Sequence, residues 1–272
     1  MSRELSNLKP ANYNLQAMRA ARIRELLQPF LDPSSEPLLT DDLLDHISTY
    51  IDILLRWNAR VNLTAIRDPE EIITRHFGES LFTARHLFPQ EKRNLREARS
   101  FATGQEGKDA KNEGQPPEDR VNDAGHEITL ADLGSGAGFP GVPIKLWAPD
   151  ITLTLIESNN KKVTFLREVV RALKLASVNV AATRAESLNR GVFDVVTLRA
   201  VERFESILPA AAALVAPGGR LVLLIGNAQI ALARSVLAKL AAEGRPNFLW
   251  EEAAPVPQSK TRTIVVARAE WT

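Results

Sequence analysis

From residue 128 onward, short apolar runs alternate with segments of helical periodicity, and this alternation constrains the fold more than any other feature. Five runs have the composition of strands that are buried on both faces: ITLADL, ITLTLIE, VNVAA, FDVVTL and RLVLLIG. The clearest helix between them is NKKVTFLREVVRALKL, whose apolar residues recur at helical spacing. This alternation predicts an α/β fold with a doubly wound, mostly parallel sheet.

The last two apolar runs, NFLWEEA and RTIVVAR, follow each other closely in the sequence. Their short separation predicts an antiparallel pair at the end of the sheet, which then has seven strands. We therefore expect residues 128–272 to form one sheet domain.

The chain before this domain divides into three parts by composition. Residues 1–37 are polar and interrupted by proline, and we expect an extension there. Residues 38–90 predict a small helical domain, with helix starts after Thr40 and after Asp68. Residues 91–127 hold few large apolar side chains among many charged ones, which predicts a flexible insertion because little surface can be buried to offset ordering.

Composition narrows the classes of function. The 272 residues include no cysteine, which excludes disulfides, thiolate metal sites and a cysteine nucleophile. The four histidines show no metal-ligand spacing, so no metal is expected. The net charge is +1, so nucleic acid would have to be bound through a local basic face. No apolar run reaches the length of a membrane span and the N-terminus lacks a signal peptide's apolar block, so we expect a cytoplasmic protein with no membrane partner. We also expect a monomer.

The stretch ADLGSGAGFPG follows the first expected strand and contains four glycines. A glycine-rich turn at this place lets a ligand approach the backbone, and an acid that ends the second strand, here Glu157, suits ribose hydroxyls. Together they indicate a cofactor that contains adenosine. Counted from Gly136, the glycines match a dinucleotide fingerprint. Counted from Gly134, they form D-x-G-x-G-x-G directly after the strand, which looks like the first motif of S-adenosylmethionine-dependent methyltransferases.

Several longer stretches resemble the RsmG family, also called GidB. They are DLGSGAGFPGVPIKL, LIESNNKKVTFLREV, TRAESL, TLRAVERFESIL and LLRWNARVNLTAIRDPEEIITRHF. The resemblance implies a class I, Rossmann-like fold and a bacterial enzyme that methylates guanine N7 in 16S rRNA, with S-adenosyl-L-methionine as cofactor. The partner is then 16S rRNA or the small-subunit particle.

The resemblance also implies which residues contact the cofactor. Carried over by position, these are Gly134, Phe139, Ala185, Glu186 and Arg199. The residue types fit these roles. The glycines at 134 and 136 allow the methionine end to approach, the acid at 157 suits the ribose, the pair at 185 and 186 could frame the adenine, and the phenyl ring at 139 supplies an apolar wall.

The sequence departs from the family pattern at three places. Ile225 stands where members often carry a lysine, which puts that lysine's role in doubt here. Glu157 stands where aspartate is commoner. Gly78 and Glu79 differ from the usual apolar residue and aspartate before Ser80.

Methylation of guanine N7 makes few demands on catalytic groups. The N7 lone pair carries no proton, so no general base is needed and alignment of the reacting atoms suffices. Arg199, at the carboxyl end of an expected strand, is our candidate for catalysis. A bidentate contact to guanine O6 and N7 would occupy the reacting lone pair. We therefore expect Arg199 to hold a carboxylate, a phosphate or at most O6; the alternative is a plain ion pair with Glu202 or Glu157.

Other functions and roles stay open at this point. The shifted glycine match favours an NAD-dependent oxidoreductase, and Ile225 favours a non-catalytic RNA-binding relative. His76 is explained at least as well by a hydrogen bond to a neighbour on a half-buried helix as by RNA contact. Trp57 is better explained by packing than by stacking on a base. A phosphate-contacting face would draw on basic residues of the helical part and of the helix after the second strand: Arg56, Arg60, Arg67, Arg75, Lys161, Lys162 and Arg167.

Overall fold

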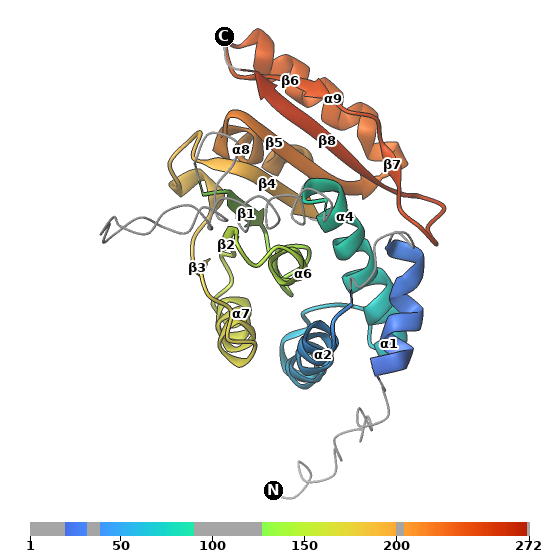
Figure 1. The fold of residues 1–272 in the computed structure, drawn as a ribbon. Coiled ribbons are helices and arrows are strands. Elements are labelled where there is room, and N and C mark those ends of the chain that lie inside the picture. Colours follow the sequence, from blue (N-terminus) through green and yellow to red (C-terminus); the bar gives the residue numbers. More distant parts are fainter. Residues whose placement is uncertain (1–19, 32–38, 90–126, 200–203, 271–272) are drawn as a thin grey trace, which may run out of the picture.

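The computed structural model describes residues 20–31, 39–89, 127–199 and 204–270. The expected insertion lies outside these residues, apart from Glu127. The described residues form three layers, in which one twisted sheet lies between two layers of helices (Figure 1).

The sheet has the strand order β3-β2-β1-β4-β5-β8-β6, and a short strand, β7, pairs with β8 beside this path. Strands β1 to β5 are parallel to one another, whereas β8 runs antiparallel to both β5 and β6. The predictions of a doubly wound, mostly parallel sheet and of a final antiparallel pair are confirmed. The described sheet has eight strands where seven were expected, because the short β7 also pairs with β8. The strands are β1 (Thr129–Leu133), β2 (Thr152–Ile156), β3 (Val178–Ala181), β4 (Phe193–Arg199), β5 (Val215–Gly226), β6 (Asn247–Trp250), β7 (Ala254–Pro255) and β8 (Arg262–Glu270).

The fifth strand begins earlier than the sequence predicts. Its pairing with β4 shifts register between Phe193 and Val195, and Gly218 and Gly219 lie at an irregularity inside the strand, before the apolar run RLVLLIG. Gly218 has a φ of 73°, a conformation that favours glycine.

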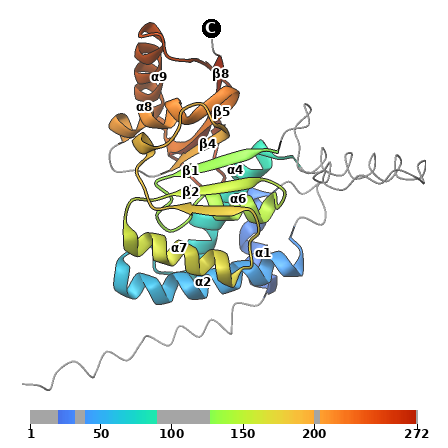
Figure 2. The same cartoon turned by 90° about the vertical axis from the view of Figure 1, so that its left-hand side faces the viewer.

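One face of the sheet is covered by α6 (Gly141–Trp147) and α7 (Asn160–Ala172), and the N-terminal helices pack on the same face. These are α1 (Ala20–Leu27), the 3-10 turn η2 (Gln28–Phe30) and α2 (Asp41–Val61), followed by the helical segment described below. Figure 2 shows α2 and α7 side by side beneath the sheet. Buried side chains from α1, α2, the glycine-turn region and α7 form one hydrophobic cluster with the sheet. The expected boundary between a helical domain and a sheet domain stays a prediction.

Both predicted helix starts are confirmed by their caps. The Thr40 hydroxyl accepts from Leu43 N–H at 3.2 Å, and the Asp68 carboxylate accepts from Glu71 N–H at 2.8 Å. The second of these helices is not uniform. It consists of α3 (Pro69–Glu71), a π-helical segment η3 (Ile72–Gly78) and α4 (Glu79–Leu87) in direct succession. The π segment was not predicted, and such widened turns are often found at functional sites.

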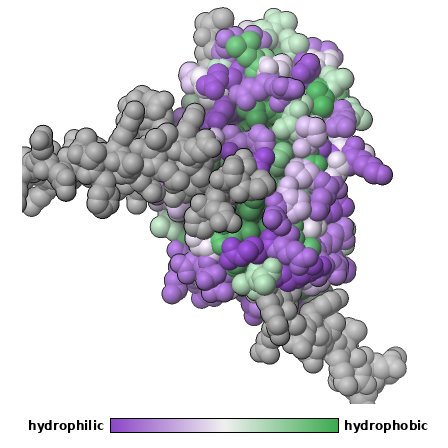
Figure 3. Space-filling model, turned by 45° about the vertical axis from the view of Figure 1, so that its right-hand side comes forward, coloured by the Kyte–Doolittle hydropathy of each residue, from purple (hydrophilic) through white to green (hydrophobic). Residues whose placement is uncertain are grey.

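The opposite face is covered by α8 (Phe204–Leu214) and α9 (Asn227–Ala242), which enclose a second hydrophobic cluster. Ile225 belongs to this cluster and is 5% exposed, so its side chain is part of the core. No helix among the described residues is long and apolar enough to cross a membrane. On the face seen in Figure 3, hydrophilic residues cover most of the visible described surface, and hydrophobic residues appear between them in smaller areas.

Candidate functional site

The glycine turn lies at the carboxyl ends of β1 and β2. β1 ends at Leu133, so the turn begins at Gly134, in the register that resembles the methyltransferase motif. Gly134 and Ser135 both donate backbone N–H groups to Ile156 O, at 2.9 and 3.1 Å. These bonds fold the turn over the edge of the sheet, where open α/β sheets bind ligands.

The glycines of the turn serve two purposes. Gly134, Gly136 and Gly138 have φ values of 69°, 54° and 84°, which residues with a side chain rarely adopt. At Gly136, a Cβ atom would meet nothing nearer than 3.7 Å, so this part of the backbone borders open space. At Gly138 a Cβ atom would lie 2.2 Å from the Tyr50 hydroxyl, and at Gly141 it would lie 2.8 Å from Asp132. Gly136 therefore leaves the turn open, and Gly138 and Gly141 allow close packing.

Glu157 joins the ends of β1 and β2. Its Oε2 accepts from Gly136 N–H at 3.0 Å and its Oε1 accepts from Asn159 N–H at 2.8 Å. The carboxylate is thereby fixed beside the open part of the glycine turn, and each oxygen has a further lone pair for a hydroxyl donor.

Asp132 lies beneath the turn and holds it to β4. Its Oδ1 accepts from the Thr197 hydroxyl at 2.9 Å and its Oδ2 accepts from Gly141 N–H at 3.2 Å. Burial raises the pKa of Asp132 to about 6, although these two hydrogen bonds favour the charged form.

Phe139 is packed between two other rings. It stacks on Tyr50 with ring centroids 5.2 Å apart and on His76 with centroids 4.7 Å apart, and Phe77 meets its edge at 5.1 Å. The Tyr50 hydroxyl donates to Ala137 O at 2.5 Å. These contacts fix the second half of the turn against α2 and η3, so the N-terminal helices are part of the site's framework.

Arg199 ends β4 and is buried, with 6% of its side chain exposed. Its Nη2 donates to Arg75 O at 2.6 Å and to Glu79 Oε2 at 2.8 Å, and lies 3.2 Å from His76 Nδ1. Its Nε is buried and has no hydrogen-bond partner among the residues that the structure describes. A buried donor without a partner is costly, and it marks a place where an acceptor from a ligand would be stabilised.

Glu79 balances several cations at this point. Its carboxylate pairs with Arg199 at 2.8 Å, with Arg262 at 3.2 Å and with Arg75 at 3.9 Å, and only 5% of its side chain is exposed. Burial lowers the pKa of Arg199, whereas the charge of Glu79 raises it. Arg199 therefore makes an ion pair with Glu79, a partner that was not among those named for the alternative of a plain ion pair. Glu157 is not its partner in the structure, and Glu202 lies outside the described residues.

His76 is held neutral beside these arginines. Burial, and after it the charges of Arg199, Arg75 and Arg262, lower the pKa of His76 to about 2. Because Nδ1 faces a donor of Arg199, the proton is assigned to Nε2, which lies 2.8 Å from the Thr64 hydroxyl. His76 therefore orients Arg199, and Thr64 orients His76.

The remaining candidates lie in separate surroundings. Ala185 is buried and Glu186 is exposed, both in the 3-10 turn η5 (Ala185–Ser187) after β3. Trp57 packs against Phe165 and donates to Glu168 at 2.9 Å, which ties α2 to α7. The side-by-side arrangement of α2 and α7 places some of the expected basic residues on neighbouring helices: Arg56 and Arg60 on α2, and Lys161, Lys162 and Arg167 on α7. A role for these residues in binding RNA stays a prediction.

Four residues of the site were not assigned a role from the sequence: Tyr50, Thr64, Glu79 and Arg262. Thr64 belongs to the stretch that resembles the RsmG family, and Glu79 was noted as a departure from it. For Tyr50 the sequence indicated only a place on the apolar face of a helix, and for Arg262 only the start of a strand. No group of three or more histidine, aspartate or glutamate residues within the described ranges could hold a metal ion.

Comparison with known proteins assigns the family. The family model described as rRNA small subunit methyltransferase G matches residues 43–95 and 120–244, which is more than half of the chain. The chain belongs to this family. The match includes η3, the glycine turn, Glu157 and Arg199, and it extends to α9.

Individual relatives carry the same description. The ribosomal RNA small subunit methyltransferase G of Halorhodospira halophila is 37% identical over 184 residues, which are 68% of this chain and 70% of the relative. That of Xanthomonas euvesicatoria pv. vesicatoria is 35% identical over 178 residues, 65% of this chain and 66% of the relative. The aligned part thus spans about two thirds of the length of these relatives.

Solved structures are more distant. Pyrococcus horikoshii TYW2, in complex with MeSAdo, is 12% identical with a TM-score of 0.46, and the match covers 53% of this chain and 58% of that one. A mutant of the 16S rRNA (adenine(1408)-N(1))-methyltransferase from Catenulisporales acidiphilia is 17% identical with a TM-score of 0.43, covering 53% of this chain and 85% of that one.

Proposed function

We propose that this protein transfers a methyl group from S-adenosyl-L-methionine to N7 of a guanine in 16S rRNA. The observation that carries the proposal is the glycine turn that begins at Gly134 beside Glu157, in a chain of the rRNA small subunit methyltransferase G family. We place the reaction in the cytoplasm, on 16S rRNA or the small-subunit particle, with a monomeric enzyme.

The residues present fit the cofactor. The open backbone at Gly136 admits a ligand, and the Glu157 carboxylate beside it has lone pairs left for ribose hydroxyls. The unpartnered Nε of Arg199 suits the carboxylate of the methionine part. Ala185 and Glu186 follow β3, on the side where the adenine would lie. When bound, the cofactor supplies a methyl group on a positively charged sulfur.

The polar side chains of the site support a reaction without a general base. Both nitrogens of His76 face partners, and the carboxylates of Glu79, Asp132 and Glu157 are engaged by arginines, a hydroxyl or backbone N–H groups. Guanine N7 presents a lone pair without a proton, so its methylation needs alignment and no proton acceptor. Arg199 would contribute by orientation and by its positive charge.

Binding measurements test the cofactor. Calorimetry on the full chain should detect S-adenosylhomocysteine and not NAD. The variant Arg199→Ala should weaken S-adenosylhomocysteine binding about tenfold or more, because a charge-assisted hydrogen bond contributes about 1.5–3 kcal/mol. Arg199→Lys keeps the positive charge beside Glu79, so it serves as the control for a loss of affinity that comes only from unfolding. Tight binding of NAD alone would establish the oxidoreductase, and wild-type binding and methyl transfer in Arg199→Ala would remove Arg199 from the site.

A further inference from the structure

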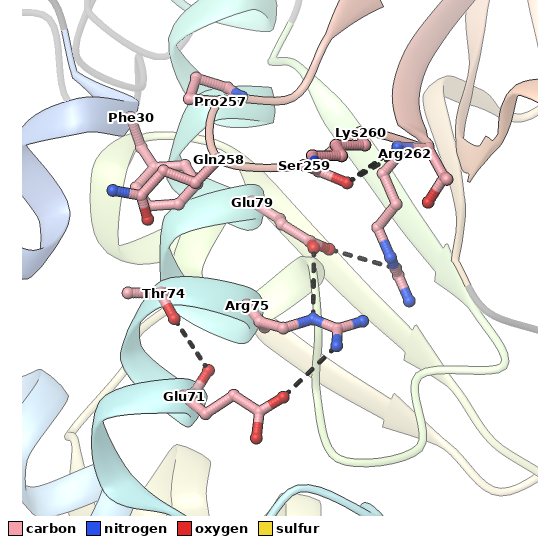
Figure 4. A pocket seen from close by; sticks show the side chains of 11 residues that line it. Phe30, Glu71, Thr74, Arg75, Glu79, Pro257, Gln258, Ser259, Lys260 and Arg262 are labelled. Carbon is pink, nitrogen blue, oxygen red and sulfur yellow. Dashed lines mark hydrogen bonds and ion pairs between the residues drawn. The ribbon is translucent and has the colours of Figure 1, made fainter.

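A pocket lies next to the site, on the other side of Glu79 from Arg199. It has a volume of about 290 Å³ and lies between the helical segment α3–η3–α4 and the turn that joins β7 to β8 (Figure 4). The helical segment contributes Glu71, Thr74, Arg75 and Glu79 to its lining, and Phe30 of η2 adds to that side. The β7–β8 side contributes residues 257–262.

The pocket has the position of a substrate subsite. Arg262 pairs with Gly226, the last residue of β5, so the pocket lies beyond the carboxyl end of that strand. Ligands of open α/β sheets bind at this edge. The glycine turn occupies the same edge at β1 and β2, and Arg199 ends β4 between the two places. Glu79 Oε2 accepts from both Arg199 and Arg262, so one carboxylate links Arg199 to the lining of the pocket.

The pocket carries an excess of positive charge. Arg75, Lys260 and Arg262 face two carboxylates, those of Glu71 and Glu79, and Glu79 is already shared with the buried Arg199. Lys260 is exposed and makes no ion pair with any residue in the described ranges. Arg75 and Arg262 are partly exposed, with 43% and 29% of their side chains accessible. Such a set favours an anion. The Ser259 hydroxyl accepts from the N–H groups of Thr261 and Arg262, so its own proton adds a further donor.

The lining favours a phosphate over a nucleobase. Unpaired bases are held by stacking on aromatic rings or guanidinium planes. The aromatic residue among the lining residues that the structure describes is Phe30, which is 2% exposed and packs on Gly78, where a Cβ would lie 2.6 Å from its ring. Its ring is therefore not available for stacking. The cationic groups of the pocket, in contrast, suit a phosphate.

We propose that this pocket binds a backbone phosphate of the rRNA substrate, through Lys260 together with the guanidinium groups of Arg75 and Arg262. The inference rests on the proposed function, because it assumes an RNA substrate. A phosphate held here would be separated from Arg199 by the Glu79 carboxylate alone, so it would fix the RNA strand relative to the methyl donor. Phosphate contacts position a nucleic acid without reading its sequence.

Lys260 offers the cleanest test, because Arg75 and Arg262 also contact Glu79. The variants Lys260→Ala and Lys260→Glu are compared with Lys239→Glu, which changes an exposed lysine of α9 on the opposite face of the sheet. Binding of the full chain to an unmodified 16S rRNA transcript is measured by filter retention between about 50 and 200 mM KCl, a range over which phosphate contacts respond strongly to salt.

We expect Lys260→Ala to weaken rRNA binding about tenfold, the loss of one charge-assisted contact, and to reduce the slope of log affinity against log salt by about 0.9. Lys260→Glu should lose more, and Lys239→Glu should behave as the wild type. The affinity for S-adenosylhomocysteine should be the same in all four proteins.

The outcomes separate the two proposals. Unchanged rRNA affinity and slope in the Lys260 variants, or an equal loss in Lys239→Glu, would overturn the pocket as an RNA subsite. Failure of the wild type to bind S-adenosylhomocysteine would overturn the proposed function, and the effect of Lys260 on rRNA binding would still be measurable. Micromolar binding of inorganic phosphate that depends on Lys260, without an effect on rRNA, would assign the pocket to a free anion and also contradict the proposal.

Discussion

Glu79 offers the sharpest quantitative prediction, because one buried carboxylate neutralises several cations. The variant Glu79→Gln keeps the shape of the side chain and one acceptor oxygen but removes its charge. With an effective dielectric constant of about 20, two unit charges 2.8 Å apart attract by about 6 kcal/mol. The neutral glutamine avoids the desolvation cost of a buried carboxylate, and this offsets part of the lost attraction. We therefore expect the free energy of unfolding to fall by about 3–5 kcal/mol, as for other buried pairs that lose one partner.

The same helical segment provides a matched control. Glu71 pairs with Arg75 at 3.3 Å, but 46% and 43% of the two side chains are exposed. The variant Glu71→Gln should therefore cost no more than about 1 kcal/mol. Urea unfolding followed by circular dichroism measures both variants under the same conditions.

A double variant tests the cause of the loss. If the isolated positive charge of Arg199 is responsible, Glu79→Gln combined with Arg199→Met should be more stable than Glu79→Gln alone, because the buried cation is gone. A cost of Glu79→Gln no greater than that of Glu71→Gln, or a double variant no more stable than Glu79→Gln alone, would contradict this cause.

Two further predictions concern the glycine turn. Gly138→Ala should lower the free energy of unfolding by about 2–5 kcal/mol, because the φ of residue 138 is 84° and the new Cβ would lie 2.2 Å from the Tyr50 hydroxyl. Adding Tyr50→Phe should return part of this loss. A Gly138→Ala variant as stable as the wild type would contradict the structure. Burial raises the pKa of Asp132 from 3.8 to about 6, so the folded state holds the carboxyl proton more tightly than the unfolded state does. The protonated Asp132 therefore contributes to stability below about pH 4, and this contribution is lost as the pH rises through about 6. At about 1.4 kcal/mol per pKa unit this is about 3 kcal/mol. Asp132→Asn should therefore gain stability relative to the wild type between about pH 4 and pH 7.5 in urea unfolding, and a constant difference would contradict the assignment.

The sequence was a good guide where local patterns decide the structure. The apolar runs marked the strands. The central strands β1, β2 and β4 are buried along most of their length, whereas the edge strands β3 and β6 are partly exposed, contrary to the burial expected for VNVAA. The caps at Thr40 and Asp68 form as their side chains predict. The end of β1 at Leu133 fixed the register of the glycine turn. In each case the interaction joins residues a few positions apart, or follows from one segment's own composition.

The rest depends on contacts between distant segments. Arg199 meets Glu79 across 120 residues, and Tyr50 reaches Ala137 across 87, so neither contact has a local signature. The π-helical segment places Arg75 O and His76 Nδ1 at the same guanidinium nitrogen, which an expected regular helix would not have indicated. A sequence pattern predicts that a residue is buried or charged, but tertiary packing decides which other residue pairs with it.

The fate of the transferred methyl group tests the central claim most directly. Purified protein, S-adenosyl-L-methionine labelled in its methyl group, and small subunits from a strain that lacks the corresponding gene are incubated together, and the rRNA is digested to nucleosides. The account predicts that the label enters 16S rRNA and is recovered as 7-methylguanosine. Recovery of the label in another nucleoside would contradict the assignment to N7, and no incorporation into 16S rRNA by a protein that binds S-adenosylhomocysteine would contradict the assignment of the substrate.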